Sequence, residues 1–196
     1  MSPRSPLPAR ILIPVANPGT AEELIRLGAA MLDPRAGELS ALGIVEVPEG
    51  MPLSEGATRA RHARRLLQKV LDYAPSGTPI HPIVRIGRHA SEGIIEASAE
   101  QEADLIIFGW GGKAPMGNDG RNGGPTVFSP TIDEVVRESP CDIAVVKQRG
   151  SRDIKRVLVP VRGGPHAELA IRFADAIATY HGATVVVLHL VPPGIT

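Results

Sequence analysis

The residues best suited to chemistry follow an apolar run that glycines close. Asp104 precedes the run at residues 105–108, and Gly109 and Gly112 follow it. An apolar run bounded by chain-breaking residues predicts a buried strand that leads into a loop. At the carboxyl end of such a strand, glycine lets backbone N–H groups approach a phosphate closely. We therefore expect Gly109 and Gly112 at the rim of a site for a phosphate-bearing ligand.

The segment after this run is rich in glycine, which predicts a long flexible loop over residues 111–127. Two interpretations of this loop stay open. The loop wraps phosphates in its own way, or Gly109 and Gly112 only turn the chain out of the sheet and the loop is a mobile insertion. Under the first interpretation the phosphate contacts would come from Lys113, Arg121, Gly123 and Gly124.

Short apolar runs alternate with amphipathic segments along residues 10–147. The runs predict strands over 10–16, 39–47, 80–87, 104–109 and 142–146. Helices are expected between them, including 57–73 and 131–139. Strands that alternate with helices predict an α/β fold with an open parallel sheet covered on both faces. Pro82 favours an edge position for the third strand, because proline cannot donate to the ladder.

The helical periodicity also predicts caps and buried faces. Thr20 with Glu23 three residues later is typical of a capping box. In the third helix we expect Ile94, Ile95, Ser98 and Ala99 to point inward. In the helix over 131–139 we expect Ile132, Val135 and Val136 to be buried.

The sequence repeats itself at an offset of 146 residues, without a gap. Arg10, Leu12, Pro14 and Val15 recur as Arg156, Leu158, Pro160 and Val161, and further identities follow through Leu42 and Leu188. The predicted organisation is a disordered lead-in or linker over 1–9, a domain over 10–147, a linker over 148–154 and an incomplete second repeat over 155–196. A β-α-β unit buries too little apolar surface to be stable alone, so we expect it to pack on the first domain or on a partner chain.

Composition excludes several classes of function. With 21 basic and 21 acidic residues and 3% aromatics, nothing favours nucleic acid as a partner. No apolar stretch reaches the roughly 20 residues that span a bilayer, and the single Cys141 favours a reducing compartment, so a cytoplasmic location is expected. The basic residues Arg61, Arg64, Arg65 and Lys69 indicate a docking face for acidic lipid or protein, or a solvated helix face.

Enzyme motifs are absent from the sequence. It has no Gly-x-x-x-x-Gly-Lys-Ser/Thr loop and no Gly-x-Ser-x-Gly elbow. Its histidines lack metal-ligand spacing, so we expect no metal. His89, after a predicted strand, is the best polar candidate near the site, but the pattern favours a solvent-exposed histidine at a helix start. We therefore expect no catalytic residues.

Three segments together resemble the universal stress protein family. They are Arg10-Ile-Leu-Ile-Pro-Val15, Ile86-Gly87-Arg88 with the run from Asp104 to Gly109, and residues 135–146. The resemblance implies a five-stranded parallel sheet of order 3-2-1-4-5 with helices on both faces, followed by the β-α-β start of a second copy. It also implies a homodimer, often formed through the fifth strand.

The nucleotide-binding branch of this family holds ATP phosphates with Gly, two residues, Gly, nine residues, Gly and Ser or Thr. Gly109 and Gly112 match the first half. The second half does not fit, because sixteen residues separate Gly112 from Ser129, the residue where the next glycine would fall, and Pro130 follows it. Thr131 has a hydroxyl group one residue after the position where the pattern requires it. The branch also has an aspartate after its first strand, where this chain has Ala16, between Val15 and Asn17. The resemblance thus implies a degenerate nucleotide site, with no cofactor expected and Mg-ATP as the alternative.

The sequence at the end of the first strand bears on function. Val15-Ala-Asn-Pro18 resembles the corresponding segment in cytosolic tails of amino-acid permeases and related transporters. The resemblance implies a non-catalytic regulatory domain attached in cis to a membrane transporter. The alternative is a soluble ATP-binding universal stress protein with at most slow ATP hydrolysis.

Overall fold

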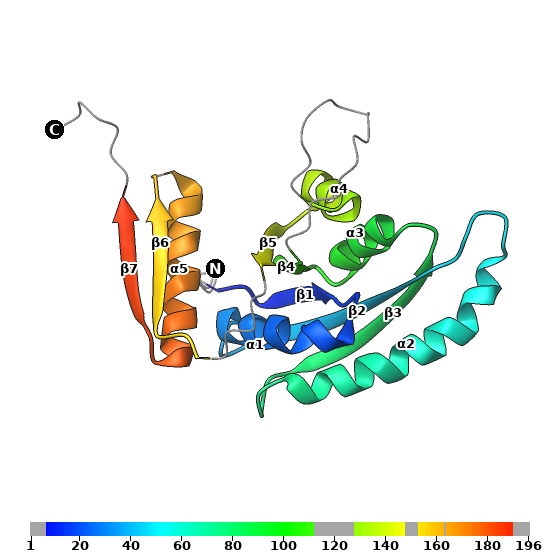
Figure 1. Ribbon diagram of the computed structural model, residues 1–196, viewed down its shortest axis with the longest axis horizontal. Helices are drawn as coiled ribbons and strands as arrows, with labels where there is room; N and C mark the ends of the chain where they lie inside the picture. The colour runs from blue at the N-terminus through cyan, green and yellow to red at the C-terminus, as the bar shows by residue number, and fades with distance from the viewer. Residues whose placement is uncertain (1–6, 112–127, 148–152, 163, 190–196) are drawn as a thin grey trace.

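Five parallel strands form the main sheet of the protein. The computed structural model describes residues 7–111, 128–147, 153–162 and 164–189 (Figure 1). The strands run in the order β3-β2-β1-β4-β5, as the family resemblance implies. Their bounds are β1 Arg10–Pro14, β2 Glu38–Glu46, β3 Ile80–Gly87, β4 Leu105–Trp110 and β5 Asp142–Lys147. Pro82 lies in β3 at the edge of the sheet, where a missing N–H costs little.

Helices cover both faces of this sheet. Helices α1 Ala21–Met31 and α2 Gly56–Val70 lie on one face, and α3 Ala90–Glu100 and α4 Pro130–Glu138 lie on the other (Figure 1). Short 3₁₀ turns precede α1 and α2 at Pro18–Thr20 and Leu53–Glu55, and a third at Leu71–Tyr73 follows α2. The four basic side chains that the sequence singled out on α2 are exposed.

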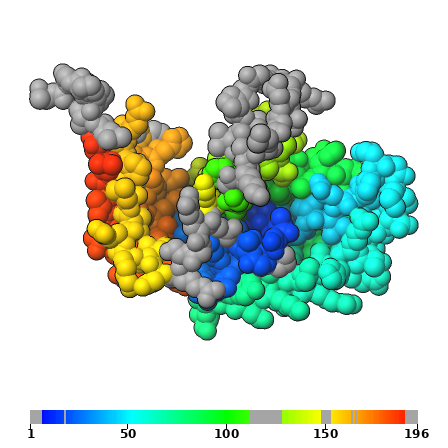
Figure 2. All heavy atoms as spheres, viewed as in Figure 1, coloured from blue at the N-terminus to red at the C-terminus, as the bar shows by residue number. Residues whose placement is uncertain are grey.

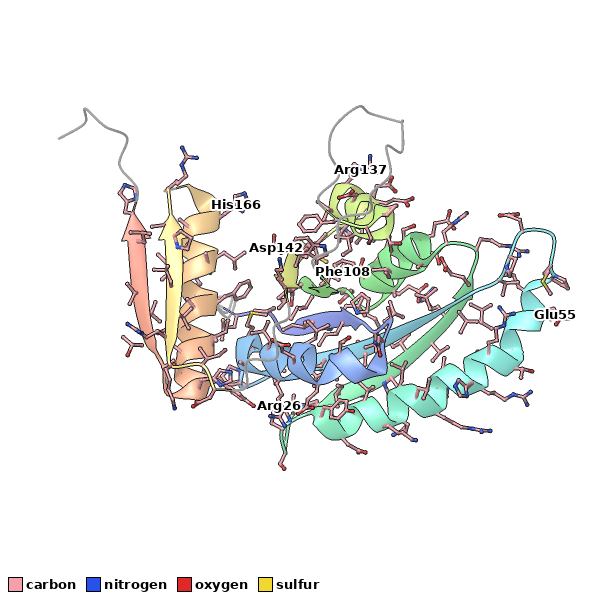
Figure 3. The ribbon with its side chains drawn as sticks, in the orientation of Figure 1. Arg26, Glu55, Phe108, Arg137, Asp142 and His166 are labelled. Carbon is pink, nitrogen blue, oxygen red and sulfur yellow. The ribbon has the colours of Figure 1, made fainter. Side chains whose placement is uncertain are left out.

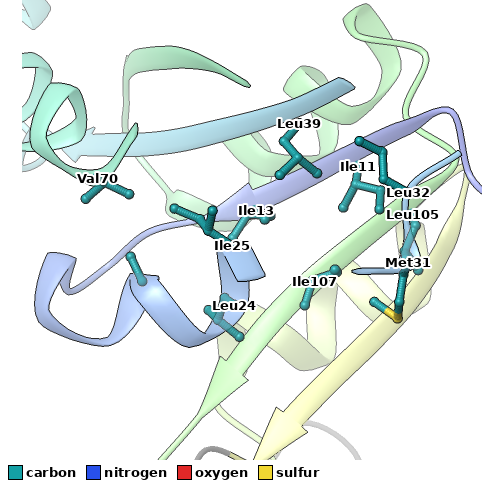
Figure 4. Packing of buried hydrophobic residues seen from close by; sticks show 11 residues of the cluster. Ile11, Ile13, Leu24, Ile25, Met31, Leu32, Leu39, Val70, Leu105 and Ile107 are labelled. Carbon is teal, nitrogen blue, oxygen red and sulfur yellow. The ribbon is translucent and has the colours of Figure 1, made fainter. Parts of the chain in front are cut away.

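Two apolar clusters hold the layers together. On one face, β1 contributes Ile11 and Ile13 to a cluster with the buried residues of α1 (Figure 4). On the other face, Leu12 packs with α3 and α4, and Phe108 of β4 lies beneath them (Figure 3). Because successive side chains of a strand point to opposite faces, a strand apolar at every position is buried on both sides. Each fully buried side chain of this size stabilises the fold by about 1.5–3 kcal/mol.

The chain ahead of β1 is held against the sheet from residue 7 onward. Pro8 is buried, and its carbonyl accepts a hydrogen bond from the Asp33 N–H at 2.9 Å. The Asp104 carboxylate accepts the backbone N–H groups of Ala9 at 2.9 Å and Arg10 at 3.0 Å. The described part of the expected lead-in therefore belongs to the folded structure.

A second β-α-β unit follows the first. It comprises β6 Arg156–Val161, α5 Pro165–His181 and β7 Thr184–His189. Arg156 pairs with Thr184 as Arg10 pairs with Glu38, so the 146-residue offset preserves the strand register. Helix α5 lies between its own strands and α1, against which Phe173 and Ile177 pack (Figures 1 and 2). The expected packing of the second unit on the first is confirmed.

Three local predictions are wrong. The expected capping box at Thr20 does not form, because its side chain makes no capping hydrogen bond. The hydroxyl instead donates to the Asn17 carbonyl at 3.0 Å. The backbone angles of Thr20, φ −107° and ψ 0°, also differ from the extended backbone typical of an N-cap. In α3, Ala97 is buried and Ala99 is exposed. In α4, Val136 is 49% exposed, because this helix covers the sheet beside its edge strand and presents only a narrow buried stripe.

Candidate functional site

The carboxyl ends of β1 and β4 lie side by side, and the described residues of the expected site lie at this edge of the sheet. Ile11 pairs with Leu105 and Leu12 with Ile106, so Val15 and Ala16 leave the sheet beside Gly109. The strand order reverses between β1 and β4, because the chain builds the sheet from β1 toward β3 on one side and then continues with β4 on the other. Ligands of open α/β sheets bind at such a reversal. The structure therefore brings the expected residues of β1 and β4 together.

The residues that follow β1 are engaged with the protein itself. The Val15 N–H donates to the Leu42 carbonyl at 2.8 Å. The side-chain oxygen of Asn17 accepts the Gly19 N–H at 2.9 Å, which closes a tight turn before α1. Ala16 is exposed and offers only a methyl group. This segment therefore presents no side-chain charge to a ligand.

At the end of β4, Trp110 occupies the space next to Gly109. Its ring meets Phe128 edge-on at a centroid distance of 5.6 Å, and the Lys147 ammonium lies 4.9 Å from the ring centroid. A cation over an aromatic face is stabilised by the ring quadrupole. The Lys147 ammonium is therefore held against the Trp110 ring at the carboxyl end of the sheet.

Helix α4 brings Ser129 and Thr131 toward the same edge. The helix is followed directly by β5, so its C-terminus lies at the start of that strand and its N-terminus points back toward the carboxyl edge. Ser129 is the N-cap, and its hydroxyl accepts the Ile132 N–H at 3.4 Å. Thr131 lies in the first turn. Gly112 and the expected phosphate-contacting residues of the long loop lie outside the described residues.

Carboxylates accompany the helix N-termini at this edge. The Glu46 carboxylate accepts the Ala90 N–H at the start of α3, at 2.8 Å. Asp133 lies in the first turn of α4, and its Oδ2 is buried without a hydrogen-bond partner among the described residues. Glu22 and Glu23 occupy the first turn of α1. Each of these helix N-termini, which would otherwise attract an anion, thus has a negative charge of its own.

A cationic side chain that directly follows β3 is also engaged. Arg88 donates from Nη1 to the carbonyls of Val47 at 3.1 Å and Pro48 at 2.6 Å. These contacts attach the loop after β2 to the end of β3. The sequence did not identify Glu46 and Arg88, because each acts on backbone about forty residues away and no local motif marks such a contact.

The described histidines do not cluster into a metal site. His89 is exposed and stands at the N-cap of α3 without a capping hydrogen bond from its side chain. His166 lies at the start of α5, away from this edge (Figure 3). Among the described residues, no group of three histidine, cysteine or acidic side chains has a geometry that would hold a metal ion.

Comparison with known proteins identifies the family. The sequence model of the universal stress protein family matches residues 9–147 and 153–196. The chain belongs to the universal stress protein family. The second matched segment contains β6, α5 and β7, in agreement with the internal repeat.

A curated relative is a membrane transporter. The chain is 29% identical over 185 residues to the Na(+)/H(+) antiporter NhaS5 of Synechocystis sp.. This match covers 93% of the chain and 26% of the antiporter, so the chain spans about a quarter of that relative's length. Within its described residues, no helix is long and apolar enough to cross a bilayer.

Solved structures share the fold. A functionally unknown protein, PA1789 from Pseudomonas aeruginosa PAO1, aligns with a TM-score of 0.61 at 17% identity, over 93% of this chain and 60% of its own. The hypothetical protein MJ0577 aligns with a TM-score of 0.50 at 19% identity, over 72% of this chain and 97% of its own. The longer of these alignments includes the second unit.

Proposed function

We propose that this universal stress protein domain is a non-catalytic regulatory module with a degenerate nucleotide site, attached to a membrane transporter. The observation that carries the proposal is the chemistry of the carboxyl edge. Ala16 offers no carboxylate there, the side chain of Asn17 closes a turn, and the starts of α3 and α4 have the acids Glu46 and Asp133.

Electrostatics favours exclusion of a polyphosphate from this edge. Two unit charges 4 Å apart interact by about 4 kcal/mol at an effective dielectric constant of 20. A triphosphate near the starts of α3 and α4 would meet carboxylates there. The cations Arg88 and Lys147 already contact the protein, through backbone carbonyls and the Trp110 ring respectively. A phosphate would have to displace these contacts.

A soluble ATP-binding protein with slow hydrolysis is the second candidate. One observation favours it: Gly109 and the N-terminal turn of α4, with Ser129 and Thr131, approach the same edge. Backbone N–H groups at such a place suit a phosphate. Mg-ATP would then be held with contacts from Val15 to Asn17, and the long loop would supply the remaining ligands.

The attachment to a transporter is supported by the antiporter relative, which has most of its length outside the matched part. The module would then lie at the cytosolic face of the membrane. A homodimer through the edge strand β5 belongs to the same proposal. Light scattering across micromolar concentrations tests this part, and a strict monomer would contradict it.

Mass spectrometry of small molecules released from the purified chain tests the degenerate site. We expect no stoichiometric nucleotide. As a positive control, ATP added in known amount before denaturation must be recovered. Co-purified ATP at a molar ratio near one would move the second candidate ahead of the first.

A further inference from the structure

Helix α2 contains five cationic residues and no acidic residue in its 15 positions. All five side chains are exposed, at Arg59, Arg61, Arg64, Arg65 and Lys69. Figure 3 shows nitrogen-tipped side chains that extend from α2 away from the sheet. The whole chain has 21 basic and 21 acidic residues, so the positive charge of this helix is a local feature of the surface.

Four of the five cations share one side of the helix and form a surface that we call the basic face: Arg61, Arg64, Arg65 and Lys69. At 3.6 residues per turn, these four positions fall within an arc of about 140°. Leu67 and Val70, which are buried, lie on the opposite side of the helix. The basic face therefore points directly away from the sheet.

No acidic side chain neutralises the basic face. On two other helices an exposed arginine pairs with a glutamate one turn earlier, Arg26 with Glu22 in α1 and Arg172 with Glu168 in α5. Within the part of the chain that the structure describes, no ion pair involves a cation of α2. The charge of this helix is thus available to an external anion.

The spacing within the basic face is unfavourable for a helix that has no partner. Arg61 and Arg65 stand four residues apart, as do Arg65 and Lys69, and like charges at this spacing destabilise a helix. Arg61 donates a hydrogen bond to the Thr58 hydroxyl at 3.2 Å, which leaves its charge uncompensated. A face that only contacts water would be more stable with acids at alternate turns. An anionic partner explains their absence.

Two exposed apolar side chains directly precede α2. Met51 is 40% exposed and Leu53 is 47% exposed. Leu53 begins the 3₁₀ turn that leads into the helix, and this part of the chain lies at the right margin of Figure 2. Surfaces that bind membranes combine cations, which attract anionic headgroups, with apolar side chains that enter the acyl boundary. Single-stranded nucleic acid would instead favour aromatic residues, and neither the turn nor α2 has one.

We propose that the basic face, with Met51 and Leu53 at its N-terminal end, docks on an anionic lipid surface. The guanidinium and ammonium groups contact lipid phosphates, and the two apolar side chains enter the boundary between headgroups and acyl chains. The inference rests on the proposed place of the module at the cytosolic face of a membrane. Its test needs no transporter, so a chain that binds no vesicles contradicts this inference alone and leaves the attachment to a transporter to its own test.

Co-sedimentation of the full chain with lipid vesicles tests the proposal. At about 0.1 M salt, where charges act over about 10 Å, we expect binding to vesicles of equal parts phosphatidylglycerol and phosphatidylcholine. Vesicles of phosphatidylcholine alone should bind none. Each cation near an anionic membrane strengthens binding about fivefold. The variant with Arg61→Gln, Arg64→Gln, Arg65→Gln and Lys69→Gln should therefore bind about a hundredfold more weakly or worse.

A charge-matched variant is the control. It removes four exposed cations from outside α2, by Arg35→Gln, Lys155→Gln, Arg156→Gln and Arg162→Gln. This variant has the same net charge as the α2 variant and should bind like the unmodified chain. Met51→Ser combined with Leu53→Ser should weaken binding severalfold and leave its salt dependence unchanged, because only the apolar contribution is lost.

Three results would overturn the proposal. The first is an unmodified chain that stays in the supernatant with anionic vesicles. The second is an equal loss of binding in the two charge variants, which would make the attraction a property of the overall charge. The third is binding to polyglutamate without binding to the vesicles, which would make an acidic protein the occupant.

The four substitutions in α2 remove repulsion between like charges and should not lower the melting temperature. If that variant nevertheless fails to fold, Arg61→Gln with Lys69→Gln takes its place, and Arg156→Gln with Arg162→Gln is then the control. The loss expected for the α2 pair is about twentyfold. An unchanged affinity of this pair would equally contradict the proposal.

Discussion

The Glu46 carboxylate caps the start of α3 by accepting the Ala90 N–H at 2.8 Å. Glu46 is the last residue of β2, and Ala90 is the first of a helix that begins after β3. The contact therefore joins two elements at the edge where a nucleotide would bind. A helix N-terminus stabilises a nearby negative charge, so this side chain occupies a position that suits a phosphate.

Removal of this cap should destabilise the domain. We expect Glu46→Ala to lower the free energy of unfolding by about 1 kcal/mol, since a backbone donor at a helix start loses its side-chain acceptor. Urea unfolding followed by circular dichroism measures the change. Glu49→Ala is the matched control, because Glu49 is an exposed glutamate in the following loop. Equal stability of the two variants would show that Glu46 is not a cap.

Equivalent leucines of the two repeats should differ sharply in their contribution to stability. Leu12→Ala leaves a cavity in a closed core and should cost about 3 kcal/mol. Leu158→Ala removes a side chain that is 61% exposed and should cost less than about 0.5 kcal/mol. The two variants serve as controls for each other in denaturant unfolding. Similar losses at both positions would contradict the exposed position of Leu158 in β6.

Asp104 should hold the chain ahead of β1. Its carboxylate accepts two backbone N–H groups, from Ala9 and Arg10. We expect Asp104→Ala to cost about 1–2 kcal/mol and to speed amide hydrogen exchange at these two residues. Asp72→Ala, an exposed aspartate after α2, should change neither quantity. Unaltered exchange at Ala9 and Arg10 in the Asp104 variant would refute this role.

The single thiol should react slowly at neutral pH. Burial raises the pKa of Cys141, and the hydrogen bond between its thiol and the Ser139 hydroxyl only partly offsets this effect. The folded state therefore keeps its proton at a pH where the unfolded thiol, with a pKa of about 8.5, has lost it. Stability should accordingly fall as pH rises above that value.

Reaction of Cys141 with a disulfide reagent measures this shift. The rate in the folded chain should rise with pH at a midpoint above that of the urea-unfolded chain, which is the control. A midpoint at or below the unfolded value would contradict the effect of burial.

The fold was accessible from sequence because its evidence is repeated and regular. Pro14 is unusual inside a strand, yet Pro160 occupies the same place in the second copy, and both residues lie in strands of the structure. The prediction of which helical residues face the core was less accurate. Ala99 lies five residues beyond Ile94 and is thus turned about 140° around the helix axis, so it could not share that residue's buried face.

The site was only partly accessible from sequence. The approach of Ala16 to Gly109 follows from the strand order, which the family resemblance implied. The contact between Glu46 and Ala90 did not, because 44 residues separate them and no spacing rule connects a strand end with a later helix. The local sequence indicates that Asp133 lies at the start of a helix, whereas the position of Glu46 at the start of α3 became visible only in three dimensions.

The central claim is that the carboxyl edge no longer accepts a nucleotide, and titration of the chain with Mg-ATP in a calorimeter tests it most directly. At millimolar ATP the proposed degenerate site predicts no heat beyond that of dilution. The variant Ala16→Asp, which restores only one side chain, should also give none, because the acids at the starts of α3 and α4 remain. Saturable binding in the micromolar range by the unmodified chain would contradict the claim and identify an ATP-binding protein.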